Sequence, residues 1–105
     1  MLAEQRRFAR LPYRTTVICT RGQETFNATS VSIGEGGMGL ESSGNAEVDD
    51  VLTLEFSMPE LKTPIRVSGK IQAKEASGRT SIEFTDTSDA CRSAIREYIY
   101  GRITE

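Results

Sequence analysis

The chain has 105 residues, a formal net charge of -2 and no histidine, with 37% hydrophobic and 27% charged residues. That length and balance are typical of one small domain with a modest core under a charged surface. Without histidine, without an apolar run long enough to span a membrane, and with only the distant cysteines Cys19 and Cys91, the sequence argues against hydrolytic triads, zinc enzymes, disulfide-stapled toxins and membrane spans.

The N-terminal residues 1–12 are predicted to form a basic arm. Arg6, Arg7 and Arg10 lie in this arm, and their positive charges precede a body that is acidic overall. Pro12 disfavours a helix here because its ring clashes with the preceding turn, so we expect an extended or turn-like arm. The arm contains no apolar leader, which together with the unpaired cysteines predicts a cytoplasmic location.

Residues 13–85 alternate between apolar and polar side chains in short runs, a pattern typical of β-strands. In the clearest run, Ile65, Val67 and Ile71 share one face with Gly69 between them. Glycine, proline and small polar residues separate the runs at roughly ten-residue spacing, which predicts a small antiparallel barrel or sandwich. The expected strands are 15–20, 24–33, 38–40, 51–57, 65–74 and 80–84.

Residues 86–105 change to a helical period. One of the residues 86–88 can supply the N-cap oxygen, and Gly101 is a plausible stop. We expect this helix to lay its apolar face over one mouth or side of the barrel. The apolar stripe consists of Cys91, Ile95, Tyr98 and Ile99.

Residues 34–39 have the spacing GxGxxG, which is also the spacing of a dinucleotide-binding loop. In that loop the pyrophosphate is held by the N-terminal amides of a helix that begins at the glycines. Residues 40–45 cannot sustain such a helix because they are mostly serine, glycine and asparagine. The glycines therefore predict a tight, bulged turn in which they adopt positive φ angles.

Two motifs in a fixed order are more informative. Residues 6–10 read Arg-Arg-Phe-Ala-Arg and contain Arg-x-x-x-Arg before the first strand, and residues 32–40 read Ser-Ile-Gly-Glu-Gly-Gly-Met-Gly-Leu at the end of the second. Ser-Gly-Lys-Ile follows at 68–71 and Thr-Ser-Ile-Glu-Phe-Thr-Asp at 80–86. Over residues 6–100 this combination resembles the PilZ domain family, bacterial receptors for cyclic di-GMP. The resemblance implies a mainly β fold, a six-stranded antiparallel barrel with a C-terminal helix, in agreement with the strand count above.

The resemblance also implies a ligand site. Arginine suits it, because the guanidinium bonds phosphate oxygens or the O6/N7 edge of guanine with two parallel hydrogen bonds and stacks on bases. The same arginines could instead make a generic anionic contact or form a solvated tail. The implied cyclic di-GMP-binding residues are Arg6, Arg7, Arg10, Ser32, Gly34 and Gly37.

The second motif departs from the family pattern Asp/Asn-x-Ser-x-x-Gly. Ser32 stands in the Asp/Asn position and Gly34 in the Ser position, whereas Gly37 matches the closing glycine. Each lost hydrogen bond is worth roughly 0.5–1.5 kcal/mol, so the two changes predict about 5- to 150-fold weaker binding. Backbone amides of the glycine turn could retain part of the contact.

The functional expectation is a receptor without catalytic residues, cofactor or metal. Ligand binding would switch contact with an unidentified protein of the motility, pilus or polysaccharide machinery. The alternative is a PilZ-like protein-interaction adaptor that no longer binds cyclic di-GMP. In a third, weaker hypothesis the basic arm binds a membrane surface or nucleic acid through charge, although the acidic body argues against a nucleic-acid partner.

Overall fold

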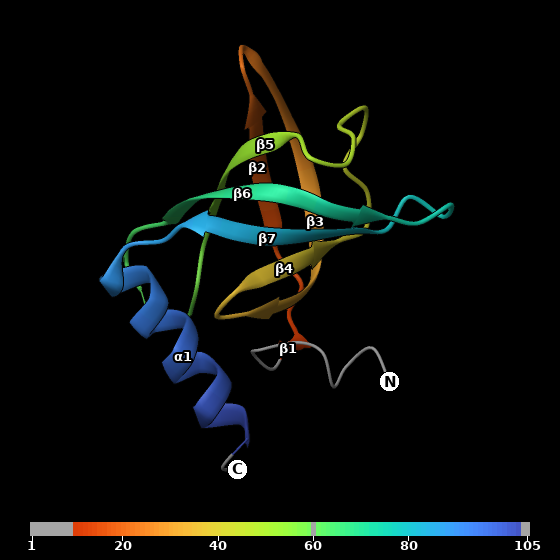
Figure 1. Cartoon of the computed structure of the whole chain (residues 1–105). Coiled ribbons are helices and arrows are strands. Elements are labelled where there is room, and N and C mark those ends of the chain that lie inside the picture. The colour runs from red at the N-terminus through yellow and green to blue at the C-terminus, as the bar shows by residue number, and fades with distance from the viewer. Residues whose placement is uncertain (1–9, 60, 104–105) are drawn as a thin grey trace.

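The computed structural model describes residues 10–59 and 61–103, which form β-strands followed by the C-terminal helix α1 (Figure 1). One antiparallel sheet has the strand order β1-β3-β2-β5-β6-β7-β4, and β4 also pairs with β3. This last pairing closes six of the strands into a barrel, as the sequence predicted. The strands are β1 (Arg10–Pro12), β2 (Thr16–Arg21), β3 (Glu24–Gly34), β4 (Gly37–Leu40), β5 (Val51–Phe56), β6 (Ile65–Lys74) and β7 (Thr80–Asp86).

The predicted alternation places the core inside the barrel. Leu52, Leu54 and Phe56 of β5 are buried, and the polar residues between them lie closer to solvent. Burial raises the pKa of the Cys19 thiol to about 11, so this cysteine packs as a neutral core residue. The remaining buried hydrophobic strand residues are Val17, Ile33, Met38, Leu40, Ile65, Val67, Ile71 and Ile82.

Strand β1 joins the sheet beside β3, on the same edge that β2 occupies further along. Its register places Arg10 opposite Gly34, Leu11 opposite Ile33 and Pro12 opposite Ser32. The sequence predicted only an extended or turn-like segment here, because three residues are too few to show a period. The pairing brings the end of the basic arm against the glycine-rich turn.

The glycines of this turn do not act as predicted. Gly37 and Gly39 are strand residues without positive φ, and both are buried. A Cβ at Gly37 would collide with the carbonyl oxygen of Ile82, and a Cβ at Gly39 would lie 2.8 Å from the Ser32 Oγ. Close approach of neighbouring groups explains glycine here, rather than backbone conformation. Positive φ occurs in other turns, at Gly22, Gly44 and Gly78.

Helix α1 (Asp89–Ile103) lies at the end of the barrel away from the β2–β3 hairpin tip (Figure 1). Ser88 is the N-cap, because its Oγ accepts a hydrogen bond from the Cys91 amide at 3.2 Å. Residues 10–59 and 61–103 contain no helix that could span a membrane. The helix buries one face against the barrel through Ala94, Ile95, Tyr98 and Ile99.

The predicted stop at Gly101 is wrong, since the helix continues to Ile103. A glycine in a helix costs only about 1 kcal/mol relative to alanine, which does not by itself end a packed helix. A Cβ at Gly101 would meet no atom within 4 Å. We therefore expect Gly101→Ala to stabilise the protein by about 0.5 kcal/mol, or roughly 2–4 °C in melting temperature. Thermal unfolding followed by circular dichroism measures this, and a lowered melting temperature would contradict it.

Candidate functional site

A cavity of about 750 Å³ lies against the outer face of the wall that β1, β3, β4, β7 and β6 form. Its floor is a row of small residues, one from each adjacent strand. The register pairs Pro12 with Ser32, Ser32 with Gly39, Gly39 with Ser81, and Ser81 with Ala73. Because small side chains leave space above the sheet, this row produces a depression of the size that small-molecule sites have.

Strand alternation explains why these residues face outward. Ile33 and Met38 point into the core, so Ser32 and Gly39, their neighbours along the chain, lie on the opposite face. The β3–β4 register shifts between Ser30 and Ser32, and this bulge lets Val31 line the cavity as well.

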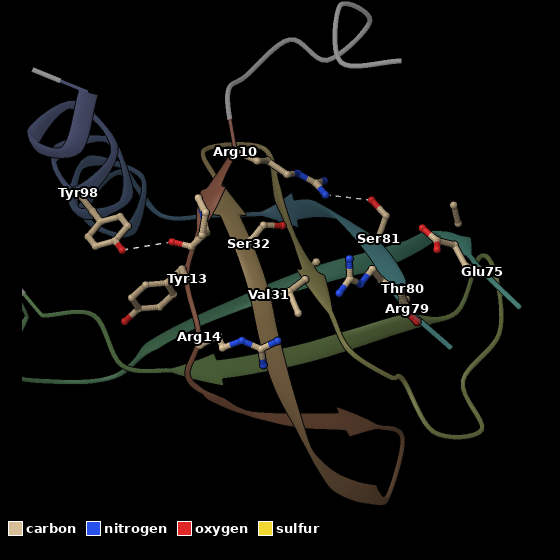
Figure 2. A pocket seen from close by; sticks show the side chains of 13 residues that line it. Arg10, Tyr13, Arg14, Val31, Ser32, Glu75, Arg79, Thr80, Ser81 and Tyr98 are labelled. Carbon is tan, nitrogen blue, oxygen red and sulfur yellow. Dashed lines mark hydrogen bonds between the residues drawn. The ribbon is translucent and has the colours of Figure 1, made fainter. Parts of the chain in front are cut away.

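Arg10 spans the rim of the cavity from β1 to β7 (Figure 2). Its Nη1 donates to Ser81 Oγ at 3.1 Å, and its Nη2 donates to the Ile82 carbonyl oxygen at 3.2 Å. The side chain starts opposite Gly34 and passes over Gly37, where a Cβ would lie 2.7 Å from Nη2. Gly37 of the second motif therefore makes room for the arginine of the first.

The other charged residues at the cavity come from separate segments (Figure 2). Arg14 forms an exposed ion pair with Glu41, with Nη1 and Oε2 2.6 Å apart. Arg79 and Glu75 line the cavity from the region between β6 and β7. Among the described lining residues three arginines stand against one carboxylate. Even with Arg14 paired to Glu41, the cavity keeps a net positive charge, as an anionic ligand requires.

Helix α1 contacts the same region through two side chains. Tyr98 lines the cavity, donates to the Pro12 carbonyl oxygen at 3.5 Å and stacks edge-on with Tyr13 at a centroid distance of 5.0 Å. Arg96 pairs with Glu35 of the β3–β4 turn, with Nη2 and Oε1 3.1 Å apart. The Glu35 hydrogen bond raises the pKa of the Arg96 guanidinium. The helix is thus attached to both chain segments that carry the sequence motifs.

The structure brings some of the predicted ligand residues together. Arg10 and Ser32 line the cavity, whereas Gly37 lies beneath the Arg10 side chain and Gly34 pairs with Arg10 across the sheet. Arg6 and Arg7 lie outside the described residues.

Sequence reasoning missed lining residues that come from distant strands and from the turn between β6 and β7, and no local signal marks them. Their position depends on the register of β4, β6 and β7, which only the folded sheet defines. The missed lining residues include Gly39, Ala73, Glu75, Arg79, Thr80 and Ser81.

No group of three or more His, Cys, Asp or Glu side chains within residues 10–59 and 61–103 is placed to hold a metal ion.

Known structures share this fold. The Bacillus subtilis inhibitor of motility MotI/DgrA superposes with a TM-score of 0.80 at 16% identity, over 95% of this chain and 52% of that one. The present chain therefore spans about half the length of that protein. The PilZ domain of CeSA from a cellulose-synthesizing bacterium superposes with a TM-score of 0.69 at 13% identity, over 90% of this chain and 98% of that one.

The PilZ domain of Escherichia coli YcgR, solved with cyclic di-GMP, superposes with a TM-score of 0.67 at 13% identity, over 92% of this chain and 90% of that one. Identities this low show a common fold.

No curated protein matches the sequence. The family profile of the PilZ domain matches residues 4–101. Since that profile match covers almost the whole sequence and the barrel and helix agree with it, the chain belongs to the PilZ domain family.

Proposed function

We propose that this PilZ domain is a cytoplasmic, non-catalytic receptor for cyclic di-GMP. The observation that carries the proposal is the position of Arg10, held by Ser81 and Ile82 at the rim of a cavity that Ser32 helps to line. A guanidinium already fixed in direction loses little freedom when it binds a phosphate or a guanine edge. The Escherichia coli YcgR domain, which has the same fold, was solved with this ligand.

The predicted ligand residues then divide into two roles. Arg6, Arg7 and Arg10 would supply positive charge and planar hydrogen-bond donors to the ligand. Ser32 would contribute a hydroxyl at the floor of the cavity. Gly37 would act through Arg10, because it leaves the space in which that side chain lies. Gly34 would contribute through its backbone, which pairs with Arg10 between β3 and β1.

The switch would operate through helix α1. Tyr98 lines the cavity and also packs on Tyr13. A ligand that displaces either ring therefore changes how α1 packs against the barrel. Arg96 connects the same helix to Glu35 in the β3–β4 turn. A ligand that binds one arrangement of these contacts more tightly shifts the population toward it, and a partner protein of the motility, pilus or polysaccharide machinery would read the helix surface.

Calorimetric titration of the wild-type chain tests the proposal directly. We expect saturable heat with cyclic di-GMP and none with GMP at equal concentration, because a single mononucleotide lacks the second base and phosphate. Absence of saturable heat with cyclic di-GMP at millimolar concentration would contradict the receptor function.

The departures at Ser32 and Gly34 favour one alternative, an interaction adaptor without a nucleotide ligand. In that case the wild-type chain should not bind cyclic di-GMP, and the double variant Ser32→Asp, Gly34→Ser should bind it. If the receptor proposal is right, the wild type binds and the double variant binds about 5- to 150-fold more tightly, since it regains two hydrogen bonds. The same titration separates the two outcomes.

A further inference from the structure

A carboxylate reaches the cavity from a turn that belongs to neither sequence motif. Glu75 and Arg79 flank the β6–β7 turn, and the Glu75 amide donates to the Arg79 carbonyl oxygen at 2.8 Å. The Gly78 amide closes the turn by donating to the Glu75 carbonyl oxygen, also at 2.8 Å. Residues that face each other at the end of an antiparallel pair project to the same side, and both side chains do line the cavity (Figure 2).

Neither of these side chains is neutralised by the rest of the described chain. The Glu75 carboxylate and the Arg79 guanidinium form no ion pair and no hydrogen bond with residues 10–59 or 61–103, whereas Arg14 at the same cavity pairs with Glu41 at 2.6 Å. A carboxylate opposes the binding of a pure anion because of its charge. Its presence beside three arginines therefore fits a ligand that carries N–H donors as well as phosphate oxygens.

Guanine offers this combination. Its O6 and N7 atoms accept hydrogen bonds, which suits a guanidinium, and its N1–H and N2 amino groups donate, which suits a carboxylate. Adenine places an acceptor at N1 and would face the carboxylate with an unfavourable lone pair. Ser32, on the same cavity, offers only a hydroxyl in the position where the family pattern has an acidic or amide residue.

We propose that Glu75 determines the base specificity of this site by accepting hydrogen bonds from the N1–H and N2 amino groups of one guanine, with Arg79 beside it for the O6/N7 edge or a phosphate. The inference rests on the proposed cyclic di-GMP function. It assigns to the β6–β7 turn a contact that the two sequence motifs do not supply, and it makes the site selective for guanine over bases without an N2 amino group.

The test compares two ligands that differ only in that amino group. Cyclic di-GMP and cyclic di-IMP, in which hypoxanthine replaces guanine, are each titrated into the wild type and into Glu75→Ala. Glu75 is exposed, so the substitution leaves the core intact. We expect the wild type to prefer cyclic di-GMP about 5- to 20-fold, and Glu75→Ala to bind both ligands with affinities within about twofold of each other. Glu97→Ala, an exposed helix substitution outside the cavity, removes the same charge and should keep the wild-type preference.

Each result decides the proposal. If Glu75→Ala retains the wild-type preference, whether or not both affinities fall together, Glu75 does not read the base and the inference is overturned while the receptor function stands. A wild type that binds both ligands equally overturns it in the same way. A wild type that binds neither ligand overturns both the inference and the proposed function.

Discussion

Arg10→Ala should weaken cyclic di-GMP binding by about 30- to 1,000-fold. This corresponds to about 2–4 kcal/mol of binding free energy for a charge-assisted, bidentate hydrogen bond. The effect is large because the substitution removes both the positive charge at the cavity rim and the side chain that Ser81 and Ile82 hold in direction. Isothermal titration calorimetry of both proteins measures the change. Arg10→Lys should recover only part of the affinity, since the ammonium keeps the charge but lacks the planar fork.

Two controls separate ligand contact from folding. Arg92→Ala removes an arginine from the exposed part of α1, away from the cavity, and should leave the affinity unchanged. Thermal unfolding of each variant shows whether the barrel is intact at the temperature of the titration. Binding heat that survives in a folded Arg10→Ala protein would refute the assignment of Arg10 to the ligand.

Gly37→Ala should destabilise the barrel by about 3 kcal/mol, which lowers the melting temperature by roughly 12–24 °C. The added methyl group would collide with the Ile82 carbonyl oxygen, a backbone atom that cannot move without separating β4 from β7. It would also lie 2.7 Å from Arg10 Nη2, so the Arg10 side chain would have to move from its observed position. The variant should therefore lose ligand affinity as well as stability, and thermal unfolding with calorimetry measures both.

Neighbouring glycines provide a graded comparison. At Gly39 the added methyl group meets side-chain atoms, Ser32 Oγ at 2.8 Å and Val31 Cγ2 at 3.1 Å, which can rotate away. Gly39→Ala should thus cost less than Gly37→Ala, while Gly101→Ala should be mildly stabilising. Equal melting temperatures for the wild type and Gly37→Ala would show that β4 can shift, and would remove the packing explanation for this glycine.

Much of the fold followed from local patterns. The alternation of Leu52, Leu54 and Phe56 predicted β5, and all three lie in the core. The stripe through Ile95 and Ile99 predicted the helix, and its apolar face packs on the barrel as expected. Such patterns are readable because burial on one face imposes a period of two on a strand and of about 3.6 on a helix.

Features without a period were harder to predict. Strand β1 has three residues, and Gly101 continues a helix that its residue type would end. Gly37 looked like a turn residue, yet the need for glycine comes from Ile82 in a strand more than forty positions away. A contact of that kind leaves no mark on the neighbouring sequence.

By itself, the amino-acid order of this protein determined the barrel, the helix and the two segments that carry Arg10 and Ser32. Only the tertiary structure decided that a row of small residues from five strands forms one floor, and that Glu75 and Arg79 share it. The physical reason is that side-chain periodicity is a local property of each strand. The register between strands is set by hydrogen bonds among segments far apart in the chain, and register determines which side chains meet.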